Sequence, residues 1–236
     1  PYHYRNWLAR RMVDVATLGA NATTKIVGIK KIRHIKTGAI ITSNHFNPVD
    51  TTIVRHGIKR AGRYRMFIVS QDTNFAMKGI LGFLMRYADE IPISKDKDYM
   101  NRHFYRTLNN LLVNKKEYIL IYPEQEMWFN YRKPRPPKRG AYLYAAKFNV
   151  PIISCFVEMK DMKKDDTEEF KKVRYILHIL DPIYPDPEKS ERDNSFEMMK
   201  KDYKQKKEAY EKAYGKPLEY AFEPSDIAGW KCGEPD

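Results

Sequence analysis

Cysteine is scarce in this chain, with two residues among 236. Cys155 and Cys232 stand at a spacing that matches no metal-binding or redox motif, so we expect reduced thiols, a reducing compartment and no bound metal. Cys155 lies within an apolar stretch, where a thiol usually serves as a small hydrophobic side chain. We therefore do not expect Cys155 to act as a nucleophile.

Long apolar runs are also lacking, since none reaches the roughly 18 residues of a membrane-spanning helix. Acidic residues are too few to balance the basic ones: 43 Lys and Arg against 30 Asp and Glu give a formal charge of +13. Such a charge indicates a negative partner, namely nucleic acid, an anionic bilayer surface or an acidic carrier protein. Because the motifs of known nucleic-acid-binding modules are missing, we do not expect nucleic acid.

A membrane surface is favoured by residues 1–20. Apolar and aromatic residues recur there at helical spacing: Tyr4, Trp7, Leu8, Met12, Val15 and Leu18. Flanking arginines make this pattern typical of a helix that lies in a membrane interface, although a helix packed on the core has the same periodicity. We expect a peripheral protein on the cytoplasmic face of a membrane, and an anchor upstream of Pro1 is compatible with that expectation.

The body of the chain predicts one α/β domain over residues 1–215. Short apolar runs predict strands at 38–43, 64–70, 90–94, 117–122, 150–157 and 172–180, and periodic segments predict helices from 48 and at 74–87, 97–114 and 139–148. Alternating strands and helices imply a mainly parallel, mixed sheet flanked by helices on both faces. The charged stretch 160–172 predicts an exposed turn, which would make the last two strands antiparallel.

The C-terminal part predicts one long helix and a tail. An apolar stripe indicates an amphipathic helix at 189–214 that packs on the domain, and its members are Phe196, Met199, Tyr203, Tyr210 and Tyr214. Gly215 and Pro217 end this pattern. Residues 216–236 have no periodicity and predict a tail.

Residues 44–50, Asn-His-Phe-Asn-Pro-Val-Asp, place an imidazole and a carboxylate at a strand-to-helix junction. Asn47 suits a helix N-cap and Pro48 the first helical position, so Asp50 projects back toward His45. A carboxylate that is hydrogen-bonded to one ring nitrogen leaves the other ring nitrogen free to take a proton from a hydroxyl. The simpler alternative is that Asp50 only caps the helix. Glu124 ends the strand at 117–122, and such strand ends meet at one cleft.

These residues resemble the glycerolipid or lysophospholipid acyltransferases, which include the 1-acylglycerol-3-phosphate acyltransferases. Four blocks match in order over about residues 35–160: the His and Asp of 44–50, the basic strand end of 91–95, the Tyr-Pro-Glu of 122–127, and the Val-Pro strand of 150–157. The resemblance implies a glycerol-3-phosphate acyltransferase-like fold. It also implies transfer of an acyl group from acyl-coenzyme A or acyl-carrier protein, without a cofactor, to a lysophospholipid such as 1-acylglycerol-3-phosphate.

The chain departs from the family where the family binds phosphate. The family has Arg in the second block and Gly and Arg in the third, and this chain has Lys95, Gln125 and Met127. Lysine is a point charge and the other two side chains carry none, so the usual phosphate contacts are weakened. Either the basic run 132–139 supplies the missing charge, or the acceptor is a glycolipid, an amino-lipid or another hydroxyl or amine.

We predict His45 and Asp50 as the catalytic pair. The predicted substrate-binding residues are Asn44, Lys95, Tyr122, Pro123, Glu124, Gln125 and Arg135. In the predicted mechanism Nε2 of His45 is a general base for the acceptor hydroxyl, and backbone N–H groups at 123–125 bind the oxyanion. The predicted lining of an acyl-chain groove is Phe75, Met77, Ile80, Leu81, Phe83, Leu84 and Met85.

Two readings of other classes compete with acyl transfer. A metal-dependent hydrolase would use His45 and Asp50 as ligands, but such a site needs at least a third ligand. A basic module that binds a membrane surface or nucleic acid would need no catalytic pair, and its binding would weaken steeply with salt.

Overall fold

A single seven-stranded sheet organises the computed structural model, which describes residues 2–63 and 65–232. Its strands are β1 (Lys25–Val27), β2 (Ala39–Thr42), β3 (Met66–Gln71), β4 (Glu90–Ile93), β5 (Tyr118–Leu120), β6 (Ile152–Asp165) and β7 (Lys171–Ile179). Their order in the sheet is β1-β7-β6-β2-β5-β3-β4. Neighbours run parallel except for the antiparallel pair β6 and β7. The predicted fold class, a mainly parallel mixed sheet, is confirmed.

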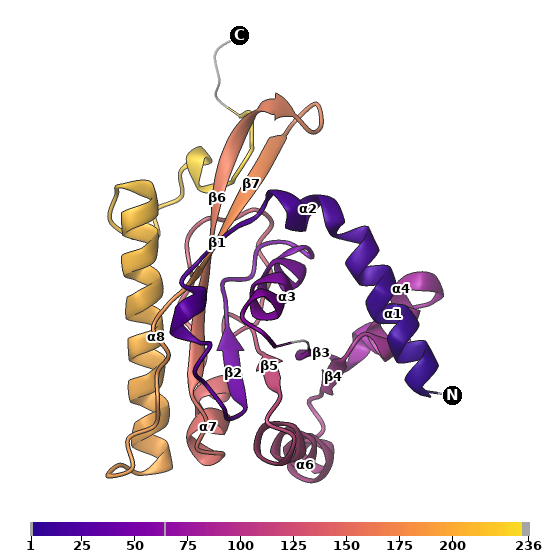
Figure 1. Cartoon of the computed structure of the whole chain (residues 1–236). Helices are drawn as coiled ribbons and strands as arrows, with labels where there is room; N and C mark the ends of the chain where they lie inside the picture. Colours follow the sequence, from indigo (N-terminus) through magenta and orange to yellow (C-terminus); the bar gives the residue numbers. More distant parts are fainter. Residues whose placement is uncertain (1, 64, 233–236) are drawn as a thin grey trace.

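Helices cover both faces of this sheet. The described helices are α1 (Tyr2–Ala16), α2 (Leu18–Thr23), η1 (Ile29–Lys31), α3 (Asp50–Arg60), η2 (Asp72–Ala76), α4 (Gly79–Tyr87), α5 (Lys97–Tyr99), η3 (Met100–Phe104), α6 (Tyr105–Asn109), η4 (Asn110–Asn114), α7 (Gly140–Lys147), α8 (Glu191–Tyr214) and η5 (Pro224–Asp226). One core cluster joins α3 to the sheet, and a second joins α6, α7 and α8 to the opposite face. Figure 1 shows α8 along one side of the sheet and the pair α1 and α4 at the other.

Several predicted elements have different bounds. Helix α3 begins at Asp50, because Asn47 and Pro48 form a turn in which the Asn47 side chain accepts from the Val49 N–H. The predicted helix 74–87 is divided into η2 and α4, with Gly79 in a left-handed conformation (φ 67°) at the start of α4. The predicted strand 64–70 begins at Met66, and Tyr64 lies outside the described residues.

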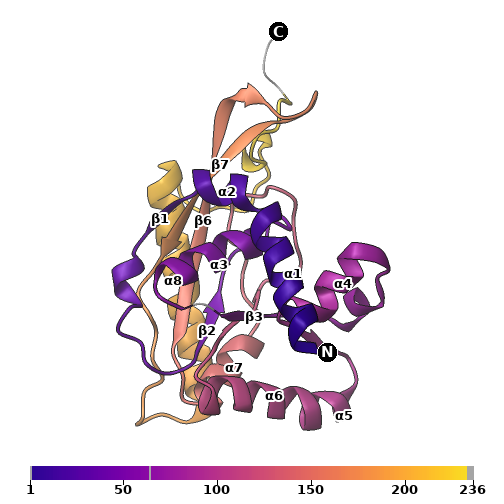
Figure 2. The ribbon, with the colours of Figure 1, turned by 45° about the vertical axis from the view of Figure 1, so that its right-hand side comes forward.

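The last two strands are longer than predicted, and one strand was missed. The stretch 160–172 is mostly strand rather than turn, because β6 continues to Asp165 and β7 begins at Lys171. This hairpin extends beyond the sheet (Figure 2), so its exposed residues bear none of the apolar alternation that reveals a strand. Strand β1 is three residues long at the sheet edge, too short to show a pattern.

Helix α1 packs on the domain through a small polar and apolar face. Ala9 is buried, and Asn6 Nδ2 donates to Asp89 Oδ1 at 2.9 Å. Its opposite face is exposed and aromatic, with Tyr4 stacked on Trp7. Among the described residues no helix has the length and apolarity needed to cross a bilayer.

The predicted tail is wrong for residues 216–232, which pack back on the domain. Asp226 and Lys133 are both buried and form an ion pair of 2.6 Å between Oδ2 and Nζ. Asn130 Nδ2 donates to the Ala228 carbonyl at 3.1 Å. This segment is ordered by contacts with distant residues, which leave no periodicity in the sequence. Residues 233–236 lie outside the described part of the chain.

We predict that Lys133→Met lowers the free energy of unfolding by up to about 3–5 kcal/mol, because it removes the buried cation 2.6 Å from Asp226 and leaves that carboxylate only the more distant Lys216 at 3.5 Å. Urea unfolding followed by circular dichroism measures this change. Lys163→Met, at an exposed position of the hairpin, is the control and should differ little from wild type. Equal midpoints for Lys133→Met and wild type would contradict the prediction.

Candidate functional site

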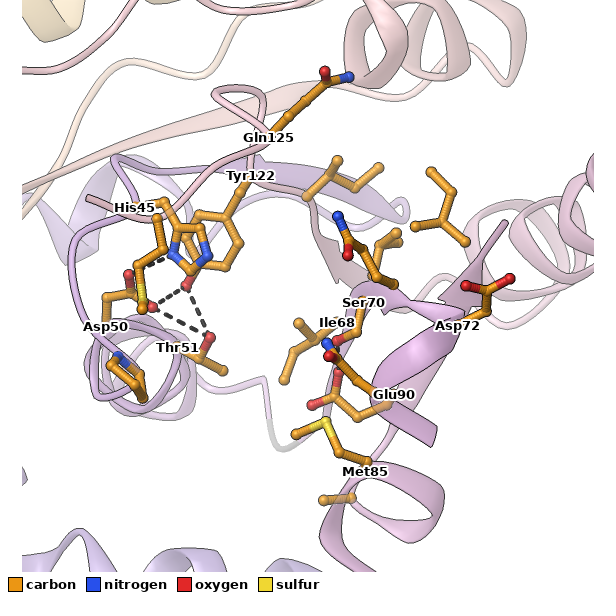
Figure 3. Close-up of a pocket in the computed structure, with 18 of the residues that line it drawn as sticks. His45, Asp50, Thr51, Ile68, Ser70, Asp72, Met85, Glu90, Tyr122 and Gln125 are labelled. Atoms are coloured by element: carbon orange, nitrogen blue, oxygen red, sulfur yellow. Dashed lines mark hydrogen bonds and ion pairs between the residues drawn. The ribbon is translucent and has the colours of Figure 1, made fainter. Parts of the chain in front are cut away.

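His45 and Asp50 lie together at the carboxyl edge of the sheet. The chain leaves β2 at Thr42, crosses that edge and enters α3 at Asp50. Nδ1 of His45 lies 2.8 Å from Oδ2 of Asp50 (Figure 3). The Asp50 side chain is fully buried, whereas 22% of the His45 side chain is exposed. The contact occupies Nδ1 and leaves Nε2 without a hydrogen-bond partner among the described residues.

The Asp50 carboxylate accepts several hydrogen bonds besides that of the imidazole. Oδ2 accepts from the backbone N–H of Phe46 at 3.0 Å and of Asn47 at 3.3 Å. Oδ1 accepts from the Tyr122 hydroxyl at 2.6 Å. Hydrogen bonds to the charged form offset the cost of burying a carboxylate. Residues 45–47 therefore wrap around the Asp50 carboxylate, and the hydrogen bond to that carboxylate fixes the orientation of the His45 ring.

Tyr122, two residues after the end of β5, contacts the pair from the other side. Its ring stacks on the His45 ring with centroids 3.9 Å apart and planes 16° apart. Burial and the neighbouring Asp50 carboxylate raise the pKa of Tyr122 well above its usual value, so the phenol stays protonated and donates to Asp50. The Thr51 hydroxyl lies 2.8 Å from the same phenol oxygen and completes the network. Tyr122 was predicted as a substrate-binding residue, and its contacts with the pair add a positioning role.

Asn44 does not reach the cleft, in contrast to the prediction. It is buried, its Oδ1 accepts from the Val157 N–H at 2.8 Å, and its Nδ2 donates to the Val157 carbonyl at 3.1 Å. These are the bonds that a neighbouring strand would make. Asn44 therefore attaches the His45 loop to β6 and is a structural residue.

Glu124 and Arg135 are bound to each other. Glu124 Oε2 accepts from Arg135 Nε at 3.1 Å and from the His45 N–H at 3.4 Å, and Oε1 accepts from the Arg135 N–H at 3.0 Å. Burial raises the pKa of the Glu124 carboxyl. The Arg135 side chain is 10% exposed and also covers the Trp128 ring. Both residues were predicted to bind substrate, but the structure places them in the support of the His45 loop.

The basic run 132–139 is mostly used inside the protein. Arg132 pairs with Asp161, and Lys133 pairs with Asp226. Within this run Lys138 lines the cleft. The idea that the whole run replaces the missing phosphate contacts is therefore wrong, and Lys138 is the residue that remains for it.

The cleft beside His45 has a volume of about 1550 Å³. Lys95, Tyr122, Pro123 and Gln125, four of the predicted substrate-binding residues, line it. The predicted acyl groove is partly present, because its walls include Met77, Leu81, Leu84 and Met85 but not Phe75, Ile80 or Phe83. Such mixed apolar and polar lining is typical of a ligand site.

The turn after β5 alters one detail of the predicted mechanism. Gln125 has φ 66°, a left-handed conformation that glycine, the family's residue here, adopts without cost. The Gln125 N–H donates to the Tyr122 carbonyl at 3.2 Å. Pro123 has no N–H, so two of the three backbone groups predicted for the oxyanion are not available.

Arg55, Ser70 and Glu90 line the cleft and were missed. Burial lowers the pKa of Arg55 and raises that of Glu90 to about 7. The Ser70 hydroxyl donates to Glu90 Oε2. A signal was present for Arg55, because it stands four residues after Thr51 and therefore on the same face of α3. None was present for Glu90, whose neighbours come from other elements.

Cys155 and a bound metal are the other reactive groups that the sequence raises. Burial raises the pKa of Cys155 to about 12, so its thiol stays protonated. In residues 2–63 and 65–232, no group of three His, Cys, Asp or Glu side chains is arranged to hold a metal ion.

The raised pKa of Glu90 predicts a pH-dependent stability. An unfolded glutamate titrates near 4.5 and folded Glu90 near 7, so the folded state binds more protons and loses stability as the pH rises through 7. Glu90→Gln cannot ionise. It should therefore unfold at a higher urea concentration than wild type at about pH 8.5, and this advantage should shrink by about pH 5. Glu126→Gln, exposed on the same cleft, is the control, and an advantage of Glu90→Gln that does not change with pH would refute the assignment.

Comparison with known proteins places this chain in a family. No curated protein matches the sequence. The fold is similar to that of the 1-acyl-sn-glycerophosphate (LPA) acyltransferase PlsC from Thermotoga maritima, with a TM-score of 0.58 and 14% identity, over 92% of this chain and 83% of that one. Residues 23–158, more than half of the chain and including the His45 loop and the Tyr122 turn, match the acyltransferase family. The chain therefore belongs to the acyltransferase family.

Proposed function

We propose that this protein transfers a fatty acyl group from an acyl thioester to the hydroxyl of a lysophospholipid, with 1-acylglycerol-3-phosphate as the expected acceptor. The observation that carries the proposal is the His45–Asp50 contact at a cleft with apolar walls. Family membership supports acyl transfer. The donor is acyl-coenzyme A or acyl-carrier protein, and both are anionic partners that suit the charge of +13.

His45 acts as the general base in this mechanism. Its Nδ1–H is donated to Asp50, so Nε2 takes the proton of the acceptor hydroxyl while the hydroxyl oxygen attacks the thioester carbonyl carbon. An ester bond forms and the C–S bond breaks. The imidazolium then returns the proton to the leaving thiolate. No acyl-enzyme is needed.

Asp50 has two tasks in the reaction. It selects the tautomer that presents Nε2, and its charge stabilises the imidazolium that forms in the transition state. Tyr122 and Thr51 hold Asp50 and are positioning residues. General-base catalysis supplies about 10²–10⁴-fold in rate, so the cleft must provide the remainder by orienting donor and acceptor.

Lys95 and Lys138 are the proposed contacts for an acceptor phosphate. Lys95 follows β4 and Lys138 precedes α7, and both line the cleft. Neither makes the bidentate contact of an arginine, so we expect them to act as point charges. An acceptor without phosphate is the second candidate, and it is favoured by Asp72, Glu90 and Glu126, which line the same cleft and repel an anion.

The same proposal places the protein on an anionic membrane surface, as a peripheral protein of the cytoplasmic face. Exposed aromatic and apolar side chains support it: Tyr4, Trp7, Val15 and Leu18 on α1 or α2, Ile80 and Leu81 on α4, and Met127, Trp128 and Phe129 beside the cleft. Side chains of this kind insert at the level of lipid headgroups.

We predict that His45→Ala lowers acyl transfer by about 10²–10⁴-fold, because the general base is lost. The variant should still fold, with a lowered melting temperature, because buried Asp50 loses one of its several donors. Asp50→Asn should lose less, since an amide still accepts a hydrogen bond but does not stabilise imidazolium. Product is measured by mass spectrometry of acylated lipid. Arg132→Met is the control, because Arg132 pairs with Asp161 outside the cleft. It should lose stability but keep most of the acyl transfer. Turnover of His45→Ala close to that of wild type would eliminate His45 as the base.

We predict that Lys95→Ala and Lys138→Ala each raise KM for lysophosphatidic acid and leave kcat nearly unchanged, because a point charge acts mainly on binding. The effect should shrink as salt screens the charges. An uncharged monoacylglycerol acceptor should be nearly indifferent to either change. If KM for lysophosphatidic acid were the same in all three proteins, the phosphate site would be refuted and a neutral acceptor favoured.

A further inference from the structure

Arg55 is a cation at the cleft that makes few interactions with other described residues. It lies on α3, is 8% exposed, and lines the cleft on the same helix face as Thr51. One hydrogen bond is formed by its guanidinium, from a terminal nitrogen to the Ala88 carbonyl at 3.2 Å. Arg55 forms no ion pair with another described residue. A guanidinium carries five N–H donors, so most donors of Arg55 remain for a bound ligand.

A carboxylate and a hydroxyl face the cleft from the sheet. Glu90 begins β4 and pairs with Ile68 of β3, and Ser70 stands two residues further along β3 on the same face. The Ser70 hydroxyl donates to Glu90. Figure 3 shows Ser70 and Glu90 across the cleft from Thr51, with Ile68 and Met85 beside them. Glu90 is thus an ionisable side chain next to apolar parts of the wall.

The neighbouring charges are already neutralised by other residues. Asp89 pairs with Arg65 at 2.8 Å and accepts from Asn6 at 2.9 Å. Asp14 of α1 pairs with Lys59 at 2.5 Å. Arg55 and Glu90 are therefore the opposite charges that remain at this part of the cleft, and each acts on the pKa of the other.

This pair of charges selects the chemistry of its ligand. An anion would meet the Glu90 carboxylate and a cation would meet the Arg55 guanidinium, so neither fits both. A bare alkyl chain would desolvate both groups and give neither a partner. A hydroxyl donates to a carboxylate and accepts from a guanidinium, and so it satisfies both groups at once.

We propose that Arg55, Glu90 and Ser70 form a subsite for a hydroxyl group of the substrate, distinct from the hydroxyl that is acylated. The inference rests on the proposed acyltransferase function. Two sources share this chemistry: a hydroxyl on the acyl chain of the donor, and a hydroxyl in the headgroup of a glycosyl or other polyol acceptor.

Two matched pairs of substrates separate these sources. The donor pair is hexadecanoyl-coenzyme A and its hydroxylated counterparts, used with one acceptor. The acceptor pair is a monoacylglycerol and a monoacyl glucosylglycerol of the same chain length, used with one donor. Each pair differs in hydroxyls but not in charge. We expect wild type to prefer the hydroxylated member of one pair by about 10- to 100-fold in kcat/KM, and that pair identifies the source.

Variants assign the preference to this cluster. Glu90→Leu and Arg55→Met should each reduce the preference to a few-fold or less, whereas Glu90→Gln, which still hydrogen-bonds, should keep most of it. Met85→Leu changes the apolar wall of the same cleft and should leave the ratio between paired substrates unchanged. Thermal unfolding checks that each variant is folded. The subsite is refuted if wild type shows no preference in either pair, or if the preference persists in both Glu90→Leu and Arg55→Met.

Binding distinguishes failure of the subsite from failure of the proposed function. Calorimetric titration of wild type with hydroxyhexadecanoic and hexadecanoic acid, and with the two acceptors, needs no turnover. Suppose that no substrate gives acylated product, but one hydroxylated lipid binds wild type at least about 10-fold more tightly than its partner and loses this advantage in Glu90→Leu. This result would overturn the proposed function and leave the subsite standing. Equal binding within both pairs would overturn the subsite whether or not the enzyme is active.

Discussion

The buried carboxylate of Asp50 is the constraint on which the site depends. A carboxylate removed from water is tolerated when donors surround it, because each hydrogen bond to the charged form offsets part of the desolvation cost. Its donors come from His45, from the backbone at Phe46 and Asn47, and from Tyr122. The β2–α3 loop and the residues after β5 must therefore meet at one place. The contacts that allow Asp50 to be buried are the same contacts that orient His45 for the proposed catalysis.

A second layer of contacts holds that arrangement to the rest of the domain. Asn44 joins the loop to β6, and Glu124, fixed by Arg135, lies against the N–H of His45. The C-terminal segment closes the layer through Asn130 and through the buried pair of Lys133 and Asp226. Arg135 and Lys133, which the sequence offers as charges for a substrate, instead form ion pairs within the protein. Most of the charges that face the cleft come from other elements, and they are Arg55 on α3, Asp72 on η2, Glu90 on β4, Lys95 after β4 and Glu126; Lys138 is the member of the basic run that joins them.

The sequence predicted the elements whose residues repeat in a regular way. Buried parallel strands are apolar throughout and α8 has an apolar stripe, so both were located to within a few residues. Elements without an apolar periodicity were mistaken: the distal part of the β6–β7 hairpin was assigned to a turn and 216–232 to a tail. The division between η2 and α4 was missed because it depends on Gly79 in a left-handed conformation, and an isolated glycine in an apolar segment does not reveal that.

The sequence by itself determined the α/β class, the family resemblance and the meeting of His45 with Asp50, because strand and helix periodicity are local and five residues of chain can place one side chain against the other. Only the tertiary structure decided that Arg135 faces Glu124 instead of a substrate, and that Arg55 shares a cleft with Ser70 and Glu90. These partners are brought together by the order of strands in the sheet and by the packing of α3 across it. A linear pattern does not encode either, since side chains from separate elements meet only after the whole core has formed.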